Sequence, residues 1–228
     1  MNLIKTELKV LLVIMIIASF IIVPASAYAR RLYPKVAPVV PVATLRLAVP
    51  YHHQEHALSC EDAGLRMLLL NRGVDEPESA ILDKTPFGPM GSDPDKVFVG
   101  DVNGRQFVTG YGIHPDGLLP IANSYFPAEA FHHKDLNFLI DRLHDGNPVE
   151  IWGSNVRNPH DYLWETPEGI LVHAVAGEHA MVVTGYAGPR TAPTHIFVSD
   201  PIAGEKVFQT STFLDVWDEY DNSGLFFK

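Results

Sequence analysis

A helix is predicted by the stretch Ser59-Cys60-Glu61-Asp62-Ala63-Gly64-Leu65-Arg66-Met67-Leu68-Leu69-Leu70-Asn71. Ser59 suits the N-cap position, and Asp62 three residues later forms an approximate capping box with it. The apolar run continues up to Gly73, which suits the C-cap. Cys60, the only cysteine among 228 residues, therefore lies in the first helical turn. There the helix dipole favours a thiolate and lowers the pKa of the thiol.

The neighbours of Cys60 leave two interpretations open. A lone cysteine cannot form an internal disulfide, so it is either a small buried side chain or a reactive thiol. Glu61 and Asp62 stabilise the first helical turn, but their negative charges oppose thiolate formation. A reactive Cys60 is therefore expected to depend on pairing with a histidine.

The N-terminal segment has the features of a secretory signal peptide. Two lysines precede an apolar stretch over residues 10–23, and Ala25 and Ala27 form an A-x-A cleavage pattern. The apolar stretch is shorter than the about 20 residues of a spanning helix. We expect residues 1–29 to be a signal peptide or an uncleaved membrane anchor. The protein is then extracytoplasmic, either secreted or anchored to the cell membrane.

The remaining chain divides into a spacer and one domain. Residues 30–47 are punctuated by prolines and are expected to be extended, which leaves residues 48–228 for one domain with its own core. The formal net charge of the whole chain is -10. This acidity argues against nucleic acid as a partner and against docking on anionic lipid through a basic face.

The order of the predicted elements indicates an α+β fold, because helices come first and strands later. Helices are predicted at residues 60–71, 77–82, 118–125, 134–144 and 210–220. Strands are predicted at residues 148–152, 180–186, 195–199 and 225–227. Residues 85–117 are rich in Gly, Pro and Asp, and such a long irregular stretch is typical of a functional loop.

Two of these strands bring a histidine and an aspartate together. A turn centred between residues 189 and 190 would pair His179 with Asp200. The same register places four apolar side chains on their face: Met181, Val183, Ile196 and Val198. Paired residues have Cβ atoms about 4.5–5.5 Å apart, which suits a hydrogen bond between imidazole and carboxylate. A Cys–His–Asp set is the arrangement that nucleophilic catalysis requires.

The oxyanion of a tetrahedral intermediate also needs hydrogen-bond donors. The backbone N–H of Cys60 is one candidate. Gln54 is the only side-chain amide shortly before Cys60 in the sequence, and it is the second candidate. Taken alone, Gln54 is more simply interpreted as a solvated loop residue.

These residues resemble the C39-like cysteine peptidases, which have papain-like folds and are related to peptidase domains of bacteriocin-exporting ABC transporters. The resemblance rests on Gln54 six residues before Cys60, on the Gly-Glu-His-Ala strand around His179, and on Asp200-Pro201. It covers about residues 49–228. It implies an α+β fold whose N-terminal helix carries the nucleophile and packs on an antiparallel sheet. It also implies that Cys60 is the nucleophile, His179 the base, Asp200 the orienting acid and Gln54 the oxyanion donor.

The sequence departs from that family at the nucleophile, where Ser59-Cys60-Glu61 replaces the usual Asp-Cys-Gly. No transporter segment is present, so the leader specificity of the transporter peptidases is not implied. The expected function is that of an exported cysteine peptidase. One alternative is a transglutaminase-like acyltransferase. The other is a non-catalytic module that binds peptide or cell wall, against which the complete set of site residues argues.

Other side chains are weaker candidates. His52, His53 and His56 could bind a metal, but they lie in a predicted loop without a carboxylate at a known spacing, and surface histidines are favoured. No cofactor or metal is expected, and the expected partner is a peptide or protein substrate. Tyr111 and Trp164, like Trp152, fit either the walls of a substrate groove or the core.

Overall fold

The computed structural model describes residues 41–156 and 159–228. The expected signal peptide or anchor, residues 1–29, lies outside the described residues, as does most of the expected spacer. The last residues of that spacer differ from the expectation, because Leu45–Arg46 forms strand β1 of the main sheet. Leu45 pairs with Tyr186, and Arg46 pairs with Gly185. The folded unit runs from residue 41 to residue 228.

Helix α3 spans Cys60–Asn71, as the sequence predicts, and Cys60 is its first residue. The other helices are α4 (Glu78–Leu82), α5 (Pro115–Asn123), α6 (Leu136–His144) and α7 (Thr210–Asp218). The strands predicted from sequence correspond to β5 (Val149–Ser154), β8 (Glu178–Ala187), β9 (His195–Asp200) and β11 (Gly224–Phe227). Within the described residues, no helix has both the length and the apolar character needed to cross a membrane.

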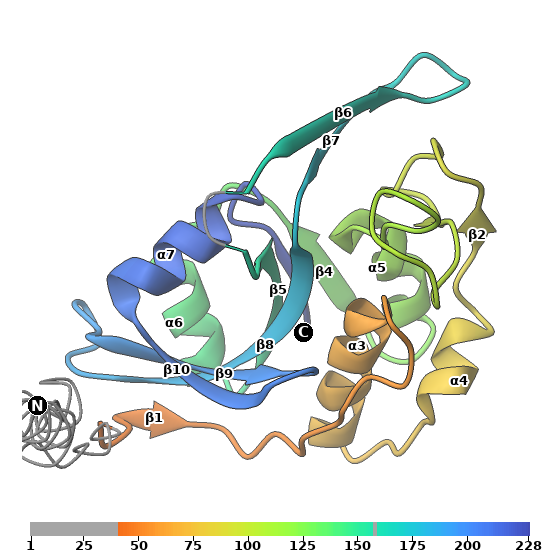
Figure 1. The fold of residues 1–228 in the computed structure, drawn as a ribbon. Helices are drawn as coiled ribbons and strands as arrows, with labels where there is room; N and C mark the ends of the chain where they lie inside the picture. Colours follow the sequence, from red (N-terminus) through yellow and green to blue (C-terminus); the bar gives the residue numbers. More distant parts are fainter. Residues whose placement is uncertain (1–40, 157–158) are drawn as a thin grey trace, which may run out of the picture. The chain divides into compact units, whose positions relative to one another are not determined.

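Several short strands were not predicted. They are β2 (Phe87–Gly88), β3 (Phe98–Val99), β4 (Ala128–Phe131), β6 (Asp161–Glu165), β7 (Leu171–Val175) and β10 (Gly204–Gln209). The β6–β7 hairpin extends away from the main sheet (Figure 1). It contacts the irregular segment at residues 85–114, where Trp164 Nε1 donates to the Ser92 carbonyl at 3.0 Å and Tyr162 stacks on Phe107.

The main sheet is antiparallel, with the strand order β10-β9-β8-β5-β11-β4, and β1 pairs with β8 (Figure 1). Side chains alternate between the two faces along each strand, and each face has its own apolar core. Ala180 and Val182 pack in the core that α3 covers. Met181 and Val183 pack in the core that α6 and α7 cover. This is the predicted α+β architecture, with the nucleophile helix packed on an antiparallel sheet.

The predicted register of the β8–β9 hairpin is wrong by two residues. Val182 pairs with Ser199 and Val183 with Val198, so His179 is not directly opposite Asp200. Next to the turn, Ala187 pairs with His195, which differs from the predicted register by three residues. The bulge between Val183 and Gly185 changes the pairing by one residue and leaves the difference of two. A shift by two residues keeps side chains on the same face, so the predicted face is correct.

Candidate active site

His179 and Asp200 form a buried hydrogen-bonded pair at neighbouring ends of β8 and β9. His179 Nε2 lies 3.0 Å from Asp200 Oδ1, and each side chain is 2 % exposed. Lys206 of β10 places its Nζ 2.5 Å from Asp200 Oδ2. The backbone N–H groups of Ile202 and Ala203 also donate to Oδ1. Both oxygens of the Asp200 carboxylate therefore accept hydrogen bonds.

These donors decide the ionisation of Asp200. Burial is the largest single influence and raises the pKa of the carboxyl, but the hydrogen bond and charge of His179, together with Lys206 and the Ala203 N–H, outweigh it. The net pKa of Asp200 lies well below its ordinary value. An ionised carboxylate on Nε2 holds the imidazole with its proton on that nitrogen, and Nδ1 is then free to accept a proton.

Cys60 lies in the first turn of α3, beside the start of β8, and is 5 % exposed. Its Sγ donates to Glu61 Oε2 at 3.2 Å, and the backbone N–H of Ala180 contacts the sulfur. No hydrogen bond joins Cys60 to His179 in the part of the chain that the structure describes. Side chains at 178 and 180 face α3, whereas His179 faces the other side of the sheet, by the alternation of the strand.

The electrostatics of Cys60 differ from the expectation of a lowered pKa. Burial raises the pKa of the thiol well above its ordinary value, and the charges of Glu61 and Glu178 raise it further. The sequence predicted that the negative charge of Glu61 would oppose thiolate formation at Cys60. Asp62 instead turns away and accepts a hydrogen bond from Thr85 Oγ1 at 3.0 Å. The thiol is therefore protonated in this arrangement.

A cluster of buried carboxyl groups surrounds the start of α3. Burial raises the pKa of all four side chains, and their mutual repulsion adds to this effect: Glu61, Asp62, Glu150 and Glu178. Glu61 accepts the Ile113 N–H at 2.8 Å, and its pKa is about 7. Both oxygens of Glu150 and the Oε1 of Glu178 have no hydrogen-bond partner among the described residues.

Two glycines make room for these carboxyls. A Cβ at Gly64 of α3 would collide with Glu150, and a Cβ at Gly112 would collide with Glu61 and Glu178. The helix and the loop before α5 can therefore approach the carboxyls closely only because both positions lack a side chain.

Gln54 is buried near Cys60, but its amide is engaged. Nε2 donates to the carbonyls of His56 and Ala57 at 2.7 and 3.1 Å, and Oε1 is buried with no hydrogen-bond partner among the residues that the structure describes. The backbone N–H of Gln54 donates to the carbonyl of Pro201, next to Asp200. The loop before Cys60 thus rests on the turn that carries the aspartate.

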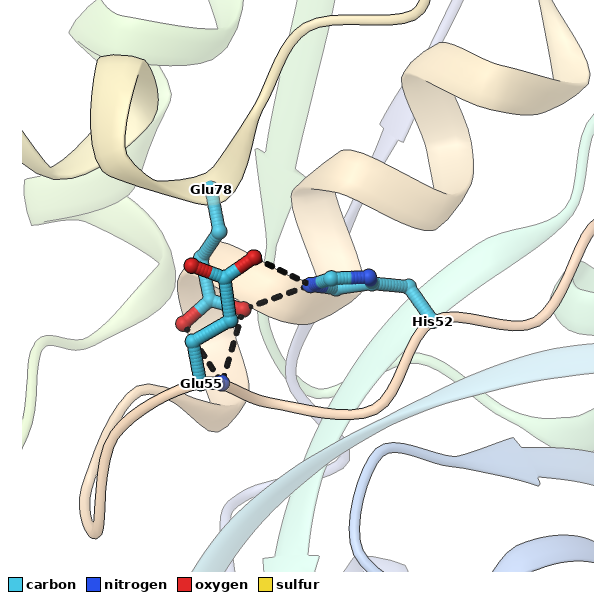
Figure 2. Close-up of side chains that lie close together, drawn as sticks. All are labelled: His52, Glu55 and Glu78. Carbon is cyan, nitrogen blue, oxygen red and sulfur yellow. Dashed lines mark hydrogen bonds and ion pairs between the residues drawn. The ribbon is translucent and has the colours of Figure 1, made fainter.

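The same loop is held from its other side by Glu78 of α4 (Figure 2). Glu78 accepts hydrogen bonds from His52 Nε2 at 2.7 Å, from the Glu55 N–H at 3.1 Å and from Ser59 Oγ at 2.5 Å. The predicted capping box is therefore wrong, since the Ser59 side chain makes no cap hydrogen bond. His52 does have a companion carboxylate, but it comes from a distant segment.

The three aromatic candidates differ in burial. Tyr111 and Trp152 are fully buried, and the Tyr111 hydroxyl bonds to that of Tyr220. Trp152 Nε1 donates to the Ile113 carbonyl at 2.9 Å. Trp164 is partly buried on the β6–β7 hairpin. Tyr111 and Trp152 are therefore core side chains.

A family model described as the Peptidase_C39 like family matches residues 46–225. The chain belongs to this family. It is therefore a cysteine peptidase, and the resemblance inferred from its motifs is confirmed. The matched residues include Cys60, His179 and Asp200, as well as Gln54.

Solved structures agree on the fold. A structure described as a C39-like peptidase from Bacillus anthracis is 21 % identical, covers 81 % of this chain and 96 % of its own, and superposes with a TM-score of 0.70. The peptidase therefore has the papain-like fold that was predicted. A double glycine motif protease from an AMS/PCAT transporter, in complex with the leader peptide, is 17 % identical, covers 82 % of this chain and 96 % of its own, and has a TM-score of 0.47. No curated protein matches this sequence significantly.

Three side chains at this site were missed from the sequence. Glu178 precedes His179, and the alternation of a strand would have placed it on the helix side. Glu150 is a charged residue within a predicted apolar strand, which was a detectable anomaly. Lys206 lies in β10, which was not predicted, so nothing local connected it with Asp200.

Proposed function

We propose that the peptidase hydrolyses peptide bonds with Cys60 as nucleophile, His179 as base and Asp200 as orienting acid, and that Gln54 helps to stabilise the oxyanion. The observation that carries this proposal is the fully buried His179–Asp200 pair at the strand ends, next to the turn that holds the Cys60 loop. The hydrogen bond from the Gln54 N–H to the Pro201 carbonyl connects the loop before Cys60 with the turn beside this pair, which supports a shared site.

The first step is transfer of the Cys60 proton to Nδ1 of His179, since Nε2 is held by Asp200. Sγ must exchange its contact with Glu61 for one with the imidazole. The thiolate then attacks the peptide carbonyl, and the imidazolium returns its proton to the leaving amine. Water, deprotonated by His179, hydrolyses the thioester and releases the acid.

Oxyanion stabilisation requires donors that are free when substrate binds. The Cys60 N–H belongs to the first turn of α3, where N–H groups lack an acceptor within the helix. The Gln54 amide now donates to two loop carbonyls, so one of these hydrogen bonds must give way to the substrate.

A cavity of about 800 Å³ is a candidate for the substrate groove. Its lining includes Lys206, which contacts Asp200, and Met181, which lies on the same face of β8 as His179. Asp215 and Val216 of α7 line its other wall.

We also propose that the enzyme acts outside the cytoplasm, with residues 1–29 as an export signal or membrane anchor. The support is the sequence pattern of a charged start, an apolar stretch and small residues. Mass spectrometry of the N-terminus of the exported protein distinguishes a cleaved signal, which begins near Ala27, from a retained anchor.

The test of the chemistry uses a thiol-directed activity probe, followed by cleavage profiling on a peptide library. We expect labelling of Cys60 and peptide hydrolysis in the wild type, and loss of both in Cys60→Ala and His179→Ala. His173→Ala is the matched control, because His173 is half exposed on β7. An unlabelled Cys60 in folded protein, with no peptide cleaved, would refute the proposal. Amide products formed with an added amine would indicate acyl transfer instead.

A further inference from the structure

Two clusters of side chains flank the start of α3, and each brings three possible metal-ligand atoms within 4.8 Å of one another. The clusters are His52–Glu55–Glu78 and Cys60–Glu61–Glu178. They differ in whether their ligand atoms already have partners.

The first cluster is satisfied by hydrogen bonds (Figure 2). The Glu78 oxygens accept from His52, from the Glu55 N–H and from Ser59 Oγ. The Glu55 side chain is half exposed, and its Oε1 lies 3.8 Å from His52 Nε2. A metal ion here would have to replace hydrogen bonds that hold the loop, so this cluster has no need of one.

The second cluster is only partly satisfied, since Cys60 and Glu61 have hydrogen bonds but one oxygen of Glu178 does not. Glu178 is 5 % exposed, and its Oε1 has no hydrogen-bond partner among the described residues. Both oxygens of the neighbouring Glu150, which is fully buried, also lack partners there. Among the described residues, no lysine or arginine forms an ion pair with Glu61, Glu150 or Glu178. Buried carboxylates need either protons or a cation.

The ligand geometry and chemistry favour a borderline-soft cation. Cys60 Sγ and Glu61 Oε2 are 3.2 Å apart. A tetrahedral Zn²⁺ with sulfur at about 2.3 Å and oxygen at about 2.0 Å separates these atoms by about 3.5 Å. A thiolate selects Zn²⁺ over Mg²⁺ and Ca²⁺, which prefer oxygen ligands.

We propose that Cys60, Glu61 and Glu178 bind a Zn²⁺ ion. The ion replaces the proton of the thiol, which leaves to solvent, and supplies the counter-charge that the buried carboxylates lack. Sulfur bound to Zn²⁺ shares an electron pair with the metal and is a much weaker nucleophile than a free thiolate, so Zn²⁺ inhibits the enzyme and its removal restores activity. This inhibition rests on the proposed role of Cys60, whereas the binding itself does not.

The test is titration of the full-length protein, freed of metal by a chelator, with Co²⁺ as a spectroscopic substitute. We expect a thiolate-to-cobalt charge-transfer band in the near ultraviolet, which Zn²⁺ abolishes by displacing Co²⁺. Cys60→Ser should lose the band. Glu178→Gln should weaken Co²⁺ binding at least about tenfold, since even residues that only support metal ligands contribute that much.

Glu55→Gln is the matched control, because it removes a carboxylate from the other cluster, and its Co²⁺ affinity should equal that of the wild type. Circular dichroism establishes that each variant is folded. Absence of the band at saturating Co²⁺, or equal affinity in Glu178→Gln and the wild type, overturns the proposal and leaves protons as the counter-charge. Weaker binding in Glu55→Gln alone would place the ion in the other cluster and overturn it too. Probe labelling in chelator tests the proposed catalytic role separately.

Discussion

Glu178 and His179 are consecutive residues of β8, and they enter opposite electrostatic environments. On the side of His179, the buried Asp200 has an imidazole, a lysine and two N–H groups as partners, and its pKa is lowered. On the side of Glu178, the buried carboxyls have few donors, and their pKa values are raised. Burial is similar on both sides, so the supply of donors decides which carboxyl is ionised.

This difference gives the two halves of the proposed catalytic set, the His179–Asp200 pair and the Cys60 thiol, different protonation states at rest. The imidazole and its acid are held in the arrangement that accepts a proton. The thiol is held protonated by the carboxyls of Glu61 and Glu178. The site therefore requires either a turn of the thiol toward His179 or a change on the side of Glu178 before it can react.

Replacement of the imidazole should have the largest effect. In His179→Ala we expect kcat/KM for a cleaved peptide to fall at least about 10³-fold, as when a member of a catalytic triad is lost. Glu61→Gln is the comparison, because Glu61 is the present acceptor of the thiol proton. If Glu61→Gln abolishes hydrolysis and His179→Ala does not, then Glu61, and not His179, is the base that accepts the thiol proton.

Asp200→Asn should be the next most damaging change. The amide keeps the size of the side chain but removes the charge that holds the imidazole tautomer, and we expect kcat to fall by about 10²-fold or more. Thermal unfolding monitors the fold. Asp161→Asn serves as control, since Asp161 pairs with His173 on an exposed hairpin. Wild-type turnover in Asp200→Asn would remove Asp200 from the mechanism.

Glu150→Gln should stabilise the fold by about 2 kcal/mol at neutral pH, because it removes a buried acid without partners. The pKa of Glu150 is raised by burial, so its cost grows as the pH rises above about 4.3, the pKa of an unfolded glutamate. The gain should therefore shrink toward pH 4. Urea unfolding in the presence of chelator measures it.

The exposed Glu168 provides the control for this change, and Glu168→Gln should leave the stability unaltered. The lowered pKa of Asp200 gives the opposite pH dependence. The folding stability that ionised Asp200 contributes is complete above about pH 4 and is lost as the pH falls further. A destabilised Glu150→Gln at neutral pH would show that Glu150 has a favourable partner.

Lys206→Met should have the smallest effect. The Lys206 side chain is partly exposed, and such an ion pair contributes at most about 1 kcal/mol, so we expect activity to fall about fivefold or less. Lys96→Met is matched to it, because Lys96 pairs with Asp93 on the surface. A loss as large as that of Asp200→Asn would mean that the lysine, rather than the imidazole, sets the state of Asp200.

The sequence by itself determined the elements that depend on local order. Apolar periodicity and flanking residues predicted α3 with Cys60 at its first position, and strand alternation predicted that His179 and Asp200 share a face. Motif order predicted the family, which the match over residues 46–225 confirmed. The helix and the strand faces follow from residues close together in the chain, and the family follows from the order of motifs along it, so a single sequence is enough to predict all three.

Only the tertiary structure decided the features that join distant segments. The turn and the bulge together set the hairpin register, the Ser59 hydroxyl donates to Glu78 instead of capping α3, and Lys206 reaches Asp200 from an unpredicted strand. Packing of α3 on β5 and β8 also enclosed both oxygens of Glu150 and the Oε1 of Glu178, which have no hydrogen-bond partner among the described residues. The pKa of a buried group depends on which distant atoms surround it, and local sequence does not contain that information.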